Sequence, residues 1–460
     1  MTGPAVFKFG GTSLGDADRV TDVAGLIAHE EEVPIVVVSA PAGVTRALLE
    51  IATGASPDAE SGARELLRRV PRELARRVGG RDLAEEVAQL VRDRLGEFDR
   101  RDSGASGAAR DMLLSVGEDV SARVLVAALA AADVPAVRID AREVIRTDAT
   151  FGAAHPDPEA IRAEACARLL PIAEEGVVPV VQGFVGATSD GDTTTLGRGG
   201  SDLSATLIGA AVASSAVHIW TDVDGILTGD PRWVDRPRSL DVVGFEEAVE
   251  LAWFGARVLH AGAAKHAVAH RLPVRIRSTF APERPGTLVL AERWGGPDIA
   301  AVACKRAVAL IQVRSRPSAI EYGFLAEVFG TLAELRTPVD LVATSHTSTA
   351  FTIDENAELG ALADALDRVA EVEVRRGLST VTVVGRGLLR EPGFAARVFQ
   401  TVAFTSVHLI SQATDSSLSF LVDDAEAEEL VRRLHLVLIE GRSGREPAAR
   451  DPLNDIEGAL

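Results

Sequence analysis

Short apolar runs alternate with longer helical stretches along roughly the first two thirds of the chain. The apolar runs are rich in β-branched residues and lack a strict apolar–polar alternation, which is typical of strands buried on both faces. Strands that alternate with helices predict a mainly parallel sheet with helices on both sides. We expect strands at residues 5–9, 35–39, 136–139, 177–182, 217–221 and 273–276, and helices at 16–29, 61–95, 108–132, 158–175 and 201–214.

The pattern changes after about Leu290, where the sequence repeats itself. Residues 323–331 (GFLAEVFGT) recur as 393–401 (GFAARVFQT), and each copy is preceded by an apolar strand and followed by a strand, a polar turn, a strand and a helix. The repeat predicts two βαββαβ units of ferredoxin-like type, which we expect to pair within or between chains. The expected domains are an α/β domain over 1–292, repeat units over 305–378 and 379–440, and a disordered polar tail over 441–460.

Composition narrows the class of protein. The formal net charge of −19 disfavours nucleic-acid binding, because a polyanion would be repelled. The N-terminus lacks the basic segment of a signal peptide, and no apolar run approaches the roughly 18 residues of a membrane span. Cys166 and Cys304 lie far apart in no metal-binding spacing, which predicts a reducing cytoplasm and no disulfide scaffold.

Lysine is scarce, and this draws attention to the first strand. Arginine fills nearly every basic position, and the lysines are Lys8, Lys265 and Lys305. Lys8 opens the segment KFGGTS at residues 8–13, whose glycines allow a close backbone approach to a phosphate while the lysine supplies a mobile point charge. The alternative is an ordinary strand–turn–helix connection capped by Thr12 or Ser13.

A second segment, TTTLGRGGSD at residues 193–202, follows the strand at 177–182 and opens a helix. Glycines, an arginine and a helix N-terminus together form an anion site. Arg198 can bind a carboxylate in bidentate fashion, and Asp202 could orient Lys8 or a metal ion. The alternative is that Asp202 only caps the helix.

Three further segments also follow predicted strands or sit in helices. The segment at 221–227 with Asp230-Pro231-Arg232 could hold a nucleotide, or it could be a surface turn. Residues 39–45 are a weak signal, and Glu118, inside a helical stretch, is by itself typical of a solvated helix face. Because ligands of such folds bind at the carboxyl ends of the strands, we expect these segments to converge there.

These segments resemble a known family. Residues 8–13, 197–202 and 221–226 look like the three signature segments of aspartate kinases, residues 254–260 are similar to a fourth, and 323–354 resemble the first ACT regulatory unit of the monofunctional, lysine-sensitive bacterial type. The resemblance runs from about residue 5 to residue 440. It implies an amino-acid-kinase fold followed by two ACT units. It also implies transfer of the γ-phosphoryl group of ATP to the β-carboxylate of L-aspartate, the first step of lysine, threonine and methionine biosynthesis, with Mg²⁺ bridging the phosphates.

The resemblance also implies roles for individual residues. Lys8 and Asp202 would be catalytic, Arg198 would bind the aspartate α-carboxylate, and Glu118 would bind its ammonium group. The nucleotide would be bound by Lys8, Gly10, Gly11, Thr221, Asp222, Arg232 and Arg257, and the aspartate pocket would be completed by Ser39, Thr45 and Ser201. No metal ion would be held by the protein alone. An amino-acid effector would contact Asp340, Thr344 and Ser345.

Several positions depart from the family pattern. Arg257 replaces a usual lysine and Leu227 a usual tyrosine near the nucleotide. His346 stands where a glutamate is usual in the effector site, and Ser318, Glu321 and Tyr322 are also unusual there. Loss of a charge-assisted hydrogen bond of roughly 1.5–3 kcal/mol should weaken the binding of a cationic amino acid. Lysine remains the favoured effector, and pairing of ACT units implies a homodimer.

Two other functions stay open from the sequence. A kinase of another acidic amino acid, such as glutamate, would use the same Arg198 and Glu118, and one extra methylene discriminates weakly. A catalytically silent amino-acid sensor would bind ligands through its ACT units, although an intact Lys8, Arg198 and Asp202 argue against it. Measuring nucleotide turnover separates these alternatives.

Overall fold

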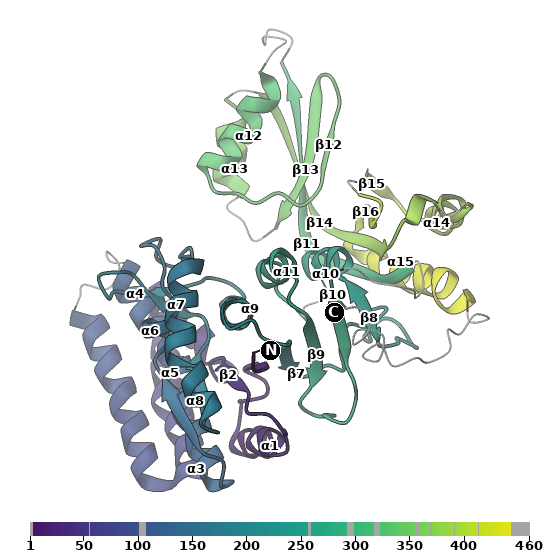
Figure 1. Cartoon of the computed structure of the whole chain (residues 1–460). Coiled ribbons are helices and arrows are strands. Elements are labelled where there is room, and N and C mark those ends of the chain that lie inside the picture. Colours follow the sequence, from purple (N-terminus) through teal and green to yellow (C-terminus); the bar gives the residue numbers. More distant parts are fainter. Residues whose placement is uncertain are drawn as a thin grey trace. The chain divides into compact units, whose positions relative to one another are not determined.

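The computed structural model describes residues 3–54, 56–100, 107–255, 259–291, 299–316, 323–355, 359–368, 370–390, 392–412 and 414–442. Two compact units make up the chain (Figure 1). The first comprises residues 1–226, 239–252 and 257–293, and the second comprises 227–238, 253–256 and 294–460. Most of the predicted tail, residues 443–460, lies outside the described residues.

The first unit is built on an eight-stranded sheet with the strand order β3-β4-β2-β1-β7-β9-β10-β8. Neighbouring strands are parallel except for β9 and β10, which confirms the predicted, mainly parallel sheet. The strands are β1 (Val6–Phe9), β2 (Ile35–Val38), β3 (Ala136–Ile139), β4 (Val178–Gln182), β7 (Val217–Thr221), β8 (Val242–Gly244), β9 (Val274–Ser278) and β10 (Thr287–Leu290). A separate hairpin joins β5 (Val185–Ala187) to β6 (Thr193–Thr195).

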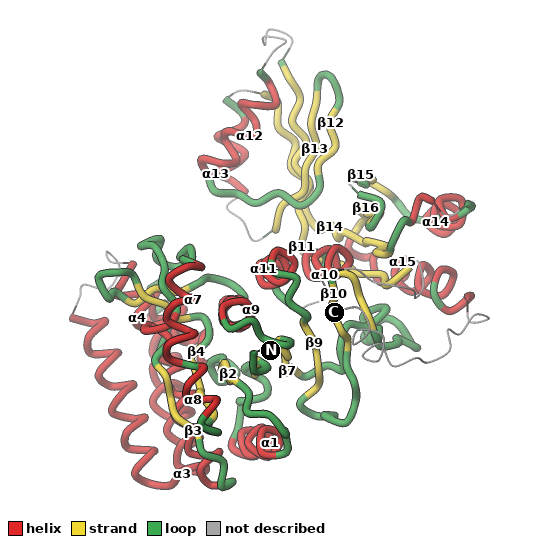
Figure 2. The backbone as a smooth tube through the Cα atoms, viewed as in Figure 1, coloured by secondary structure: helices red, strands yellow, loops and turns green. Residues whose placement is uncertain are grey.

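Helices cover both faces of this sheet (Figure 2). They are α1 (Ala17–Ala28), α2 (Val44–Ala52), α3 (Pro57–Arg100), α4 (Gly107–Leu114), α5 (Val116–Ala131), α6 (Ala141–Val144), α7 (Pro158–Arg168), α8 (Leu170–Glu174), α9 (Gly200–Ala211), α10 (Phe245–Trp253) and α11 (Ala261–Ala269). Phe7 and Phe9 point into one core with α1, α2, α3 and α5. Side chains alternate along a strand, so Lys8 points to the opposite face, against which α9 packs.

The second unit contains an antiparallel six-stranded sheet with the order β12-β13-β11-β14-β16-β15. Its strands are β11 (Ile299–Ser315), β12 (Val342–Thr344), β13 (Ser348–Asp354), β14 (Ala370–Gly385), β15 (Val407–Ser411) and β16 (Ser417–Asp423). Its helices are α12 (Phe324–Glu334), α13 (Leu359–Leu366), α14 (Phe394–Val402) and α15 (Asp424–Leu438), with short 3₁₀ turns at Leu388–Arg390 and Glu440–Arg442.

The sequence repeat appears as two ferredoxin-like halves, as predicted. The repeated Gly-Phe pair starts a helix in each half, and Gly323 and Gly393 precede α12 and α14 in the left-handed conformation, with φ of 100° and 80°. The long central strands β11 and β14 pair along almost their whole length and run through both halves. The core around α12 and α13 contains Ile311, whereas the core around α14 and α15 contains Val302 from the same strand. Across the described part of the chain, no helix has both the length and the apolar character needed to cross a membrane.

Candidate active site

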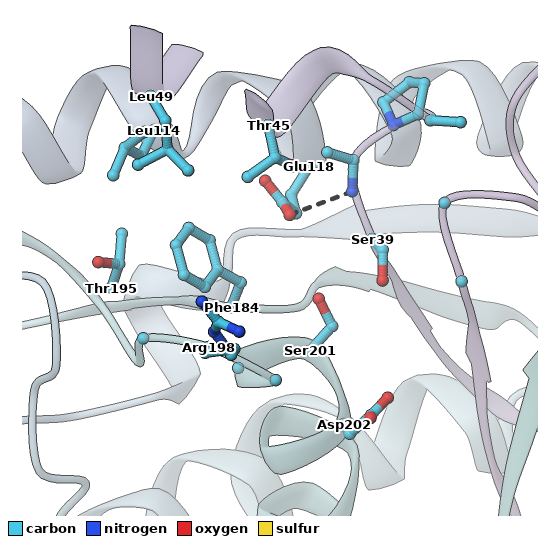
Figure 3. A pocket seen from close by; sticks show the side chains of 18 of the residues that line it. Ser39, Thr45, Leu49, Leu114, Glu118, Phe184, Thr195, Arg198, Ser201 and Asp202 are labelled. Carbon is cyan, nitrogen blue, oxygen red and sulfur yellow. Dashed lines mark hydrogen bonds between the residues drawn. The ribbon is translucent and has the colours of Figure 1, made fainter. Parts of the chain in front are cut away.

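A pocket of about 680 Å³ opens in the first unit where β1, β2 and β7 end and α9 begins (Figure 3). It brings together segments that the sequence predicted to converge at the carboxyl edge of the sheet. The predicted residues in its lining are Lys8, Gly10, Gly11, Ser39, Thr45, Glu118, Arg198, Ser201, Asp202, Thr221 and Asp222.

Lys8 and Asp202 form the ion pair that the sequence suggested. The Lys8 Nζ lies 2.7 Å from Asp202 Oδ1, and both side chains are mostly buried. Asp202 sits in the first turn of α9, where the helix dipole stabilises a carboxylate. The other oxygen, Oδ2, accepts a hydrogen bond of 3.3 Å from the backbone N–H of His260. Asp202 therefore holds the ammonium group of Lys8 at the pocket wall while being held itself.

Two glycines are required by close backbone approach. A Cβ atom on Gly11 would lie 2.6 Å from the carbonyl oxygen of Ala40, which faces it across the pocket floor. Gly199, directly before α9, has φ of 73°, and a Cβ there would lie 2.0 Å from the His260 ring. The turns after β1 and before α9 can thus pack tightly and leave room for a ligand beside their backbone N–H groups.

Glu118 is a buried carboxylate with one free oxygen. The residue is 3% exposed, and its Oε1 accepts a hydrogen bond of 3.1 Å from the Ala40 N–H. Its Oε2 is buried and has no partner among the described residues. Burial, with a small contribution from the neighbouring Asp119 charge, raises the pKa of Glu118 to about 8. A buried acceptor of this kind at a pocket wall suits a ligand that brings a positive charge.

The expectation that Glu118 lies on a solvated helix face is therefore wrong when drawn from the helical pattern alone. Helix α5 packs against α3 on one side and the sheet on the other, so even its polar first turn is buried. The role implied by the family resemblance fits this burial better.

Arg198 offers the complementary charge. It is exposed at the turn before α9, lines the pocket, and makes no ion pair with any described residue. Figure 3 shows Arg198, Ser201 and Glu118 around the same cavity. A guanidinium and a carboxylate on separate elements match the two charged groups of an α-amino acid.

The structure adds pocket residues that sequence reasoning missed. Leu49, Leu114 and Phe184 supply apolar wall, and Arg110, Gly152 and Thr195 complete it. Thr195 lies inside the singled-out 193–202 segment, so its position was available from the sequence. The others had no sequence signal, because they come from helices and loops that only the fold brings together.

Buried Asp111 ties two of these segments together. Its Oδ2 accepts hydrogen bonds from the Gly152 N–H at 2.8 Å and the Thr195 N–H at 2.7 Å. Burial raises the pKa of this carboxyl group. The loop at Gly152 and strand β6 thus form one continuous wall.

The predicted nucleotide ligand Arg232 is not part of the pocket lining. Arg232 belongs to the second unit, where its guanidinium pairs with Asp230, and Leu227 belongs to the same unit. Arg257 lies outside the described residues. Their assignment to the nucleotide stays a prediction.

The predicted effector residues lie in the second unit. Asp340 is 4% exposed in its side chain and forms a 2.6 Å ion pair with Lys305 Nζ. Ser345 shares a hydrogen bond of 2.7 Å with Ser348, and Thr344 ends β12. His346 is described, whereas Ser318, Glu321 and Tyr322 lie outside the described residues. An amino acid whose ammonium group bound Asp340 would have to replace Lys305.

Comparison with known families gives two matches. Residues 4–278 match the amino acid kinase family, and residues 381–438 match the ACT domain.

Curated relatives are similar along nearly the whole chain. Lysine-sensitive aspartokinase 3 of Escherichia coli is 36% identical over 450 residues, which cover 96% of this chain and 100% of that protein. Aspartokinase 1 of Arabidopsis thaliana chloroplasts is 34% identical over 469 residues, covering 95% of this chain and 80% of that protein.

Solved structures are also similar along nearly the whole chain. The crystal structure of E. coli aspartokinase III with aspartate and ADP, in the R-state, has a TM-score of 0.87 at 36% identity and covers 95% of this chain and 99% of that one. The T-state of the same enzyme with lysine and aspartate has a TM-score of 0.80 over the same shares. The family match and relatives of this similarity show that the chain belongs to the aspartokinases, within the amino acid kinase family.

Proposed function

We propose that the pocket is the active site of an aspartate kinase, which transfers the γ-phosphoryl group of ATP to the β-carboxylate of L-aspartate and forms 4-phospho-L-aspartate and ADP. The observation that carries this proposal is the charge pattern of the pocket. A free guanidinium, a buried carboxylate with an open oxygen, and a lysine held by an aspartate surround one cavity. An amino dicarboxylic acid needs these three partners, for its α-carboxylate, its ammonium group and its reacting carboxylate.

These charges determine the proposed binding mode of aspartate. Arg198 binds the α-carboxylate and Glu118 Oε2 accepts from the ammonium group, while the hydroxyl groups of Ser39, Thr45 and Ser201 complete the pocket. The ammonium group then satisfies the carboxylate oxygen that lacks a partner among the described residues. Binding an amino acid thereby removes a buried unpaired acceptor, which favours association.

The transfer step needs positioning and charge neutralisation rather than a general base. An ionised β-carboxylate oxygen attacks the γ-phosphorus, the bond from that phosphorus to the β,γ-bridging oxygen breaks, and ADP leaves with the electron pair. Lys8 lies beside the transferring group and balances the charge that spreads over its oxygens. Asp202 keeps Lys8 in place through the 2.7 Å pair.

The nucleotide is assigned to the turns that follow β1 and β7. Gly10 and Gly11 face the phosphates, and Thr221 and Asp222 lie at the end of β7 in the pocket lining. Arg232 and Arg257 are further proposed ligands. Because Asp222 lines the same cavity, the lining fits Mg²⁺ that is held chiefly by the phosphates. When bound, this ion supplies additional charge neutralisation at the phosphates.

Regulation, assembly and location complete the proposal. We assign residues 1–292 to catalysis and 305–378 and 379–440 to two ACT units that pair in a homodimer. Lysine is the proposed effector, supported by the E. coli relative named as lysine-sensitive. The free cysteines Cys166 and Cys304 support a cytoplasmic location.

ADP release by the purified chain tests the proposal, with Mg-ATP and either L-aspartate or L-glutamate. We expect turnover that depends on aspartate and falls by at least about 10³-fold in Lys8→Ala, because the group that neutralises the transition state is lost. The Lys265→Ala variant is the matched control, since Lys265 is exposed on α11 and does not line the pocket. Turnover with glutamate alone, or none while ATP still binds, would refute the proposed substrate.

A further inference from the structure

A buried arginine outside the pocket connects the elements that carry the proposed substrate ligands. Arg142, in α6, donates to Ser115 Oγ at 2.7 Å, to Asp140 Oδ1 at 2.9 Å, to Thr193 Oγ1 at 3.0 Å and to Asp119 Oδ2 at 3.2 Å. Its partners come from the start of α5, from β6 and from its own helix cap. The Arg142 side chain is 15% exposed.

The contacts close into a ring. Asp119 is 2% exposed, and its second oxygen accepts from Gln182 Nε2 at 2.7 Å. Gln182 ends β4, and its Oε1 accepts from the Ala141 N–H at 2.8 Å. Ala141 is the residue before Arg142, so the ring returns to its starting point through the backbone. A closed ring of this kind fixes α5, β4 and α6 relative to one another.

Two hydrogen-bond partners of Arg142, Asp119 and Thr193, connect it to elements that line the pocket. Asp119 directly follows Glu118 in the first turn of α5. Thr193 begins β6, whose last residue, Thr195, lines the pocket and precedes the turn that carries Arg198. Arg142 itself is not part of the lining, so any effect that it has on the substrate passes through these neighbours.

We propose that Arg142 is a positioning residue for the amino-acid substrate: by joining Asp119 and Thr193, it sets the spacing between the carboxylate of Glu118 and the guanidinium of Arg198. This inference rests on the proposed function, because it concerns the two groups assigned to the ammonium and the α-carboxylate. It predicts an effect on aspartate and not on the nucleotide.

The charge of Arg142 is part of this role. The Asp119 carboxylate is buried beside Glu118, and removing Arg142, its closest cationic partner, leaves this negative charge only to the more distant Arg123 and Arg138, at 3.7 and 4.0 Å. Breaking one side of a buried pair disturbs a structure far more than removing both sides. Arg142→Met should therefore harm the site more than the double variant Arg142→Met/Asp119→Asn, whose amide is neutral and can still accept from Gln182.

The test measures steady-state KM and kcat for aspartate and for Mg-ATP in full-length variants. We expect Arg142→Met to raise the KM for aspartate by about tenfold or more, with the KM for Mg-ATP changed by less than about twofold. The double variant should recover part of the loss. Thr193→Val removes one bond only and keeps the charge pair, so it should raise the aspartate KM by about threefold even if Arg142→Met fails to fold.

Arg123→Met is the matched control. Arg123 also lies on α5 and contacts Asp119, through the main-chain oxygen at 2.9 Å and Oδ1 at 3.7 Å, but its other partner is Glu86 on α3. It should lower thermal stability without changing the aspartate KM selectively. Equal rises in both KM values, an equal effect of Arg123→Met, or an unchanged aspartate KM in Thr193→Val and Arg142→Met would overturn the inference.

The same assays distinguish failure of the proposed function from failure of the positioning role. A native chain without aspartate-dependent ADP release refutes the substrate assignment, and the positioning role falls with it. A native chain that turns over aspartate, together with variants that bind it normally, refutes the positioning role alone.

Discussion

The ionisation of Glu118 gives the pocket a pH dependence whose sign and size follow from its burial. Burial raises the pKa of this carboxyl group to about 8 in the free protein, so below that pH it is mostly protonated and neutral. A neutral carboxyl group attracts an ammonium ion weakly, and hence aspartate binding should strengthen as the pH rises toward 8. From a pKa of about 8, the ionised fraction is roughly 1% at pH 6 and roughly 50% at pH 8.

These fractions translate directly into kinetics. If only the ionised form binds aspartate, kcat/KM for aspartate should rise about 50-fold between pH 6 and pH 8, because this ratio reports the enzyme before aspartate binds. The assay is ADP release at saturating Mg-ATP across that range. Glu118→Gln keeps the shape but cannot ionise, so its kcat/KM should be low and should lose the Glu118 component of the slope.

The comparison between the two proteins isolates Glu118 from the titration of the nucleotide and of other residues. A flat kcat/KM profile in the native chain would refute the reasoning. So would a Glu118→Gln profile with the same slope as the native one, because the titrating group would then lie elsewhere.

Two further predictions concern the second unit. Thr228 Oγ1 shares a hydrogen bond of 2.9 Å with His435 Nε2 and accepts one of 3.0 Å from the Arg238 N–H. Thr228→Val leaves these buried polar groups unpaired and should lower the free energy of unfolding by about 1–3 kcal/mol, whereas Thr228→Ser should stay near native in thermal unfolding. If lysine inhibits through Asp340, Lys305→Met should lower the lysine concentration for half-inhibition by at least about fivefold, because the competing ammonium group is gone. Asp340→Asn should abolish inhibition by lysine. An unchanged inhibition curve in both variants would exclude this site.

Six strands of the first unit's sheet were predictable because each is a short, largely apolar run between clear breaks. The strands expected at residues 136–139 and 217–221 match β3 and β7, and those expected at 5–9, 35–39, 177–182 and 273–276 differ from β1, β2, β4 and β9 by a residue or two at their ends. Strands β5, β6, β8 and β10 were not predicted, and the three threonines of β6 resemble a loop. In β11, polar Lys305 and Arg306 interrupt the apolar pattern, so only its second half, from Val308, was predicted as a strand.

The residues of the candidate site also fall into those that the sequence predicted and those that it did not. Lys8, Arg198 and Asp202 were visible because glycines and charged residues cluster at the ends of predicted strands. Asp111 and Arg142 were not visible, because a buried charged residue inside or beside a helix has the same local sequence as an exposed one. Only the contacts across the fold distinguish them, which is why burial of Glu118 could not be predicted from its helix.

The long strands β11 and β14, which both halves of the second unit share, decide whether each half could fold without the other. Val302 belongs to the core of the C-terminal half, yet it precedes the whole N-terminal half in the sequence. A cut between residues 378 and 379 would leave the C-terminal fragment without residues 299–305 of β11, which pair with residues 380–385 of β14, whereas the N-terminal fragment would keep all of its strands. The C-terminal half thus depends on a strand that the chain supplies before the N-terminal half, and the N-terminal half has no matching need. Exchange of the C-terminal half between two such chains would therefore preserve its sheet only if residues 299–305 were exchanged with it.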